Sequence, residues 1–153
     1  MRKLWRAVLL AFLSLGPGTR LQAEGLPFAA DPATGYALSG NDPVAYFIDH
    51  DAVPGKLAFE FRWQGAVWVF VNEGNRAAFV ADPAVYAPQF SGCDPYSLAE
   101  GYATTGNALI FALFRQRLFL FYSEVNRFLF LANPDVLLAA AAQQADQLGC
   151  SLK

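Results

Sequence analysis

Cys93 and Cys150 are the only cysteines of this chain, and His50 is its only histidine. A carboxylate, Asp94, and a phenol, Tyr96, follow Cys93 within three positions. Cys93, Asp94, Tyr96 and His50 are therefore the candidate ligands for a metal such as copper. A tetrahedral zinc site needs about four nitrogen or sulfur ligands, which two cysteines and one histidine do not supply.

The two cysteines leave three interpretations open. In an exported protein they most simply form a disulfide, and Cys93–Cys150 would close a loop of 57 positions. Closing a loop of that size stabilises a fold by about 4 kcal/mol in the chain-entropy model. Alternatively, both sulfurs hold a monovalent copper ion with a third donor from a partner, or the thiols stay free or pair between molecules.

His50 lies between Asp49 and Asp51 in a polar turn. It could bind a divalent metal or carry a proton, or it is simply a solvated turn residue. No base is identifiable beside either cysteine, and the chain has no nucleophile elbow, zinc-protease helix motif, phosphate loop or dinucleotide fingerprint. We therefore expect neither an enzyme nor a resident cofactor, with copper or another divalent metal as the alternative.

Residues 1–23 have the pattern of a secretory signal peptide. Basic residues precede a short apolar run, 7–15, and Leu21-Gln22-Ala23 offers a cleavage site. The alternative is an uncleaved anchor, but the apolar run is too short to span a bilayer comfortably. We expect a periplasmic or secreted protein without a stable membrane span after cleavage.

Cleavage after Ala23 removes four basic residues and no acid, so the net charge moves from −2 to −6. An acidic chain without a basic stripe does not neutralise phosphates, which excludes nucleic acid as a partner. It also disfavours anionic membrane surfaces. The remaining 130 residues are enough for one domain with a real core.

Residues 58–92 predict a hairpin followed by helices. Residues 59–63 alternate between apolar and polar, as in a half-buried strand, and Gln64-Gly65 predicts a tight turn before a second strand at 66–71. Asn72 can cap a helix, and Asp82-Pro83 can end it and start a short one.

A second hairpin is predicted from 109–114 and 118–122, although its turn, Arg115-Gln116, has no residue that favours positive φ. Both strands are apolar throughout, so either helices cover both faces or one face is an interaction surface; we favour the first. The two hairpin–helix units are weakly similar to each other in pattern, but the chain has no internal repeat with the spacing of a solenoid.

Two further helices follow the second hairpin. Ser123 can cap a helix through Leu131, and the spacing of Val125, Phe128 and Leu129 predicts their burial. Phe130 lies off that stripe, which leaves open a helix buried on two sides. Asn133-Pro134 starts the last helix, which Gly149 can end.

The opening Gly40-Asn41-Asp42-Pro43-Val44-Ala45-Tyr46-Phe47 and the stretch 59–92 resemble the secreted, single-domain branch of the YHS domain family. The resemblance covers Tyr36 to Leu148. It implies a small α+β module of a kind often proposed to bind metal. Where that family commonly has its cysteine this chain has Asp94, and its thiol, Cys93, is shifted by one position.

Together these features predict an α+β fold: one domain, residues 36–150, with a small antiparallel sheet from two β-hairpins and packed helices. A mobile leader, 24–35, would precede it and a tail, 151–153, would follow. The expected function is that of an exported YHS-like accessory or binding module with an unidentified protein partner. The alternative is a periplasmic copper-handling protein that uses Cys93, and a small hydrolase or redox enzyme is the least favoured reading.

Overall fold

The computed structural model describes residues 27–151. After η1 (Pro27–Ala29), the chain forms two halves of the same design. The first half consists of η2 (Ala37–Gly40), α1 (Ala45–Ile48), β1 (Lys56–Trp63), β2 (Ala66–Phe70), α2 (Glu73–Ala81) and α3 (Pro83–Tyr86). The second half consists of η3 (Gln89–Gly92), α4 (Pro95–Ala99), β3 (Asn107–Phe114), β4 (Arg117–Phe121), α5 (Glu124–Ala132) and α6 (Pro134–Gln144).

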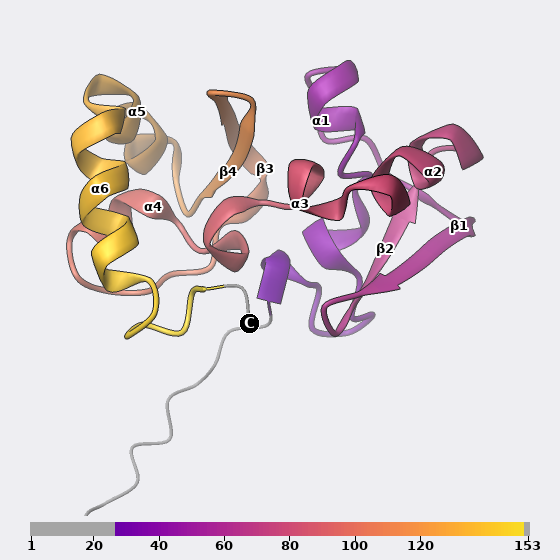
Figure 1. Ribbon diagram of the computed structural model, residues 1–153, viewed down its shortest axis with the longest axis horizontal. Helices are drawn as coiled ribbons and strands as arrows, with labels where there is room; N and C mark the ends of the chain where they lie inside the picture. The colour runs from indigo at the N-terminus through magenta and orange to yellow at the C-terminus, as the bar shows by residue number, and fades with distance from the viewer. Residues whose placement is uncertain (1–26, 152–153) are drawn as a thin grey trace, which may run out of the picture.

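The predicted α+β fold class is confirmed. Each hairpin, β1–β2 and β3–β4, forms its own two-stranded antiparallel sheet instead of joining one sheet. Figure 1 shows the two hairpins in separate halves, with α2 beside the first and α4, α5 and α6 around the second. Among residues 27–151 no single helix is long and apolar enough to cross a membrane. Helices α5 and α6 reach that length and composition only as a pair, and they bend by 111° where they meet.

The resemblance between the halves is closer than the sequence pattern indicated. Residues before the hairpins correspond at a spacing of 52, as in Asp42 and Asp94, and residues within the hairpins and the following helices at a spacing of 51. Both hairpins carry an irregular register near their start, between Lys56 and Glu60 and between Asn107 and Phe111. The halves therefore share one arrangement, offset by one residue before the hairpin, and they diverge at their last helix, where α3 has 4 residues and α6 has 11.

A buried aspartate holds each unit together. The Asp42 carboxylate accepts hydrogen bonds from the N–H of Val44 (2.8 Å), the N–H of Val71 (2.7 Å) and the side-chain amide of Asn75 (2.7 Å). Asp42 is completely buried. A carboxylate loses its hydration on burial, and the hydrogen bonds from these donors offset that free-energy cost. The side chain ties the start of α1 to the end of the hairpin and to α2.

Asp94 repeats this arrangement in the second half. It accepts from the N–H groups of Tyr96 (2.8 Å) and Tyr122 (2.9 Å) and from the side-chain amide of Asn126 (2.6 Å). It too is completely buried. Asp42 and Asp94 thus have the same structural role, one in each half of the protein.

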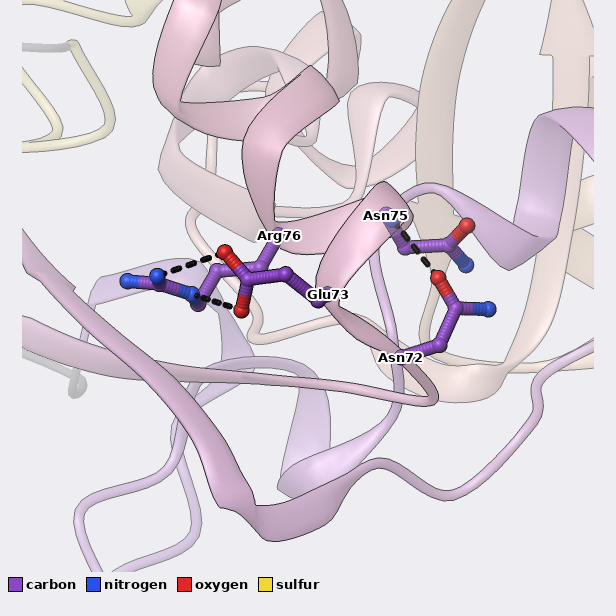
Figure 2. Close-up of polar contacts among 4 residues, drawn as sticks. All are labelled: Asn72, Glu73, Asn75 and Arg76. Atoms are coloured by element: carbon purple, nitrogen blue, oxygen red, sulfur yellow. Dashed lines mark hydrogen bonds and ion pairs between the residues drawn. The ribbon is translucent and has the colours of Figure 1, made fainter.

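The helix that follows each hairpin begins in the same way. Figure 2 shows that Asn72 accepts the N–H of Asn75 (2.9 Å) and that Arg76 pairs with Glu73 (2.6 Å) at the start of α2. In the second half, Ser123 accepts the N–H of Asn126 (3.2 Å), and Arg127 pairs with Glu124 (2.6 Å). The predicted caps at Asn72 and Ser123 are therefore confirmed.

The largest core cluster is rich in aromatic rings and extends from the first half to the second hairpin, which contributes Ala108, Leu118 and Leu120. Phe79 from α2 packs against Trp68 (4.8 Å between ring centroids) and Trp63 (5.8 Å). Phe28 packs against the same two indoles, at 5.0 Å from Trp68 and 5.6 Å from Trp63. Phe28 and Ala29 lie in the segment 24–35 that was expected to be mobile, and both are buried. The cause is the large apolar surface that the two indoles offer to a third ring. Residues 24–26 of that segment and the predicted signal peptide, 1–23, lie outside the described residues.

The second hairpin is packed on both faces, but helices, which were expected to cover both, cover only one of them; the other lies against the largest core cluster. On one face Phe111 and Leu113 pack against the large core of the first half, where Tyr46 meets Phe111 edge-on at 4.8 Å. On the other face Ile110, Ala112 and Phe114 pack against the cluster that contains Phe130. The turn at Arg115-Gln116 forms with φ values of 50° and 57°. Tertiary packing of the strands therefore overrides the poor local turn residues.

One helix-face prediction is wrong. Val125, Phe128 and Leu129 of α5 were expected to be buried, but their exposed fractions are 64%, 72% and 38%. Phe130 is instead completely buried and packs on Phe121 (5.2 Å). The reason is the bond between Asn126 and Asp94, which turns the Asn126–Phe130 side of α5 inward.

We predict that Asp94→Ala lowers the free energy of unfolding by about 3 kcal/mol or more, because it leaves several buried donors without an acceptor. Asp42→Ala should cost a similar amount, since its network is equivalent. Urea denaturation measures both, with exposed Asp49→Ala as the control, expected to change stability by less than about 0.5 kcal/mol. Loss of less than about 1 kcal/mol in both buried variants would contradict this role.

Tyr46 generates a prediction about pH. Burial raises the pKa of Tyr46 above its ordinary value of 10.0, with Asp51 and Asp42 adding to the effect. Its stabilising contribution is therefore complete below pH 10 and is lost as the pH rises further, because the unfolded chain releases a proton that the folded chain keeps. The phenol also donates to the carbonyl of Ala108 (2.9 Å).

Tyr46→Phe should therefore cost about 1 kcal/mol at neutral pH, through the lost hydrogen bond, and should flatten the decline of stability above pH 10. Urea denaturation at neutral pH and at alkaline pH tests both parts. Parallel alkaline declines in the two proteins would show that Tyr46 is not the group responsible.

Candidate functional site

The structure brings together only some of the predicted site residues. Cys93, Asp94 and Tyr96 lie together around the start of α4, whereas His50 is exposed just after α1, in the other half of the molecule (Figure 1). Among residues 27–151, no three histidine, cysteine or acidic side chains are grouped as metal ligands.

Cys93 forms a disulfide with Cys150, with 6.0 Å between their Cα atoms. The predicted pairing is confirmed, and the disulfide is typical of an oxidising compartment. Cys150 is buried in a small cluster with Leu98, Ala141 and Ala145. The bond therefore fastens the segment after α6 to the start of α4, and in this state neither sulfur is a thiolate ligand or nucleophile.

Asp94 and Tyr96 are likewise engaged in the fold. The carboxylate of Asp94 holds the hairpin and α5, as Asp42 does in the first half. Tyr96 is half-buried and packs on the cluster of Phe119, Phe121 and Phe130. The signal that marked Asp94 as a candidate ligand, a carboxylate beside a cysteine, is explained by a structural role that recurs at Asp42.

The shifted pKa values lie at structural contacts. The hydrogen bond from Arg76 lowers the pKa of Glu73 and raises that of Arg76 itself, at the exposed start of α2. The N–H of Thr34 lowers the pKa of Asp31, whose carboxylate closes a turn. Tyr46, whose pKa burial raises, lies in the core. Each of these shifts is explained by folding contacts alone.

A groove in the second half was not predicted as a site. It has a volume of about 360 Å³ and lies between η3, the β3–β4 hairpin and α6. Its apolar lining consists of Phe90, Phe114, Phe119 and, from α6, Leu138 and Ala142. The only sequence signal for it was the unbroken apolar character of the second hairpin.

Two arginines at the hairpin turn give the groove a cationic rim. Arg115 lies 5.3 Å above the ring of Phe114 and pairs with Asp135 at 2.8 Å, both side chains being well exposed. Arg117 donates one hydrogen bond to the carbonyl of Ala84 (3.2 Å). Since a guanidinium has five N–H donors, both arginines retain donors for a ligand.

Comparison with known proteins gives no match: no family model fits the chain, and no curated protein or solved structure is significantly similar to it.

The disulfide generates a stability prediction. The double variant Cys93→Ser/Cys150→Ser should lose about 4 kcal/mol of unfolding free energy, because its unfolded chain is no longer cross-linked. Urea denaturation of the variant and the oxidised parent measures the difference. Intact mass should show a gain of about 2 Da on reduction of the parent, one hydrogen for each sulfur. Two thiols that alkylate without reductant would contradict the pairing.

Proposed function

We propose that this chain is an exported, non-enzymatic accessory module, YHS-like in both halves, that acts by binding another protein. The observation that carries the proposal is the outer face of α5, defined as Val125, Phe128, Leu129 and Leu131. Their exposed fractions are 64%, 72%, 38% and 47%. At about 100° per residue, Phe128 lies opposite the inward direction between Asn126 and Phe130.

The first half provides an internal reference for this face. Phe79 and Phe130 are equivalent and both are completely buried, so α2 and α5 present the same side to their cores. The outward positions differ in size. Gly74 and Ala77 of α2 correspond to Val125 and Phe128 of α5. Ala78, the counterpart of Leu129, packs against the core, and Val80, the counterpart of Leu131, is exposed as Leu131 is. The large side chains are thus not required by the fold of the unit, and a requirement outside the fold explains them.

The chemistry of this face fits a protein surface. Full burial of one such apolar side chain is worth about 1.5–3 kcal/mol, so four neighbours provide a substantial driving force. The paired charges of Glu124 and Arg127 lie on the same helix and supply a polar rim. The acidic charge expected after export disfavours an anionic membrane as the alternative occupant.

A binding role also agrees with how the reactive side chains are used. Cys93 is in the disulfide, and the Asp94 carboxylate holds backbone and amide donors. An activated nucleophile needs a free side chain beside a base, and neither residue meets that requirement.

Site-specific photo-crosslinking tests the proposal in the protein's native compartment. A photoreactive residue at position 128 should yield one discrete adduct with another protein, and the same residue at position 77, the counterpart on α2, should yield none. Equal labelling at both positions, or no adduct at 128, contradicts the proposal. An adduct of twice the chain mass identifies a second copy as the occupant and contradicts a different partner.

Folding must be separated from binding in this test. Phe128→Ala should change the free energy of unfolding by less than about 0.5 kcal/mol because the ring is exposed, whereas Phe130→Ala should cost about 3–5 kcal/mol. Phe128→Ala should nevertheless abolish an adduct formed from position 125. A large loss of stability in Phe128→Ala would show that the face belongs to the fold.

The copper-handling alternative rests on the proximity of the two sulfurs, whose Cα atoms the fold holds 6.0 Å apart. Reduction would present both to a soft monovalent ion. Titration with monovalent copper under strictly anaerobic conditions distinguishes the two functions. Stoichiometric binding by reduced protein that Cys93→Ser abolishes would favour copper handling, and its absence would remove that alternative.

A further inference from the structure

The groove of the second half has an occupied counterpart in the first half. Phe114 and Phe119, which line the groove, correspond to Trp63 and Trp68. In the first half Phe28 packs against both of these indoles and is only 1% exposed. The groove therefore borders the two hairpin positions whose counterparts in the first half hold an aromatic ring.

Two further lining positions have larger side chains than their counterparts in the first half. Phe90 of the groove corresponds to Leu38, and Leu138 corresponds to Ala87, both of which are buried in the first half. The groove has thus kept an apolar lining, with larger side chains at both positions. An apolar recess that still accepts a ring is a favourable site for one, because burial removes both surfaces from water.

The rim of the groove differs in charge from the equivalent positions of the first half. Arg115 and Arg117 correspond to Gln64 and Ala66, which are neutral. Both arginines border the groove, and only one of them is paired with an acid, Asp135. The rim therefore carries a net positive charge in a chain whose total charge is negative. Arginine binds a carboxylate through two parallel N–H bonds, so the rim selects an anionic group of that shape.

We infer that the groove binds a small aromatic carboxylate, with the ring between Phe90, Phe114 and Phe119 and the carboxylate at Arg117 and Arg115. A cavity of roughly 150 Å³ is enough to bind a single benzene ring. The volume of about 360 Å³ therefore accommodates one or two fused rings. This site is separate from the outer face of α5 and does not depend on the proposed protein partner.

Calorimetric titration of the oxidised protein with 2-naphthoate tests the inference, with neutral 2-naphthamide as the matched probe. Naphthoate should bind with one-to-one stoichiometry and at least tenfold more tightly than the amide. Arg117→Gln should remove most of that preference. Asp135→Asn should strengthen naphthoate binding, because it frees Arg115 from its present partner. Equal binding of the two probes would overturn the assignment of the carboxylate to the arginines.

A second variant locates the ring. Ala142 is exposed on α6 and borders the groove, so Ala142→Phe should fill the recess without disturbing the core and weaken binding of both probes at least tenfold. Phe128→Ala should leave naphthoate binding unchanged. The inference fails if Ala142→Phe binds naphthoate like the parent, or if Phe128→Ala abolishes binding. Far-ultraviolet circular dichroism and thermal unfolding confirm that each variant is folded.

Discussion

A buried carboxylate with a full set of donors is the interaction on which each half of this protein depends. Asp42 and Asp94 each join the segment before a hairpin to the strand end and to the helix that follows. A short two-stranded hairpin is marginal by itself in water, so a charged anchor that gathers three segments at one point replaces the support of a larger sheet. The same anchor also fixes which side of α2 and α5 faces inward.

The two halves share this arrangement but differ in how the aromatic surface of the hairpin is covered. In the first half Phe28 completes a cluster with Trp63, Trp68 and Phe79, so the aromatic surface is covered by the chain itself. In the second half the disulfide fastens the segment after α6 to α4, and the corresponding aromatic surface is left as a groove. Closure of the first half depends on Phe28 of η1, a segment that precedes the repeated unit.

Local periodicity was sufficient to predict the hairpins, the caps at Asn72 and Ser123 and the fold class, since alternation at 59–63 and a cap at Asn72 are properties of neighbouring residues. The disulfide was one of three interpretations that two cysteines in the chain left open. The inward face of α5 was mispredicted because Val125, Phe128 and Leu129 form as good an apolar stripe as the side that contains Phe130, and only the Asn126–Asp94 bond decides between them. The groove could not be predicted either, because it depends on a space between η3, β3–β4 and α6 that no single segment encodes.

Because the two halves are similar, each residue can be compared with the residue at the equivalent position of the other half. Asp94 beside Cys93 suggests metal chemistry when considered alone. Asp42, however, accepts hydrogen bonds from the equivalent donors in the first half, and its neighbour there is not a cysteine but Asn41, whose amide donates to the carbonyl of Leu38. A role shared by both copies belongs to the fold. The fold does not require a feature that is present in only one half. Examples are Phe128, whose counterpart is Ala77, and Arg117, whose counterpart is Ala66. The residues that distinguish the second half are therefore where the function of this chain should be sought, and they lie on the outer face of α5 and around the groove.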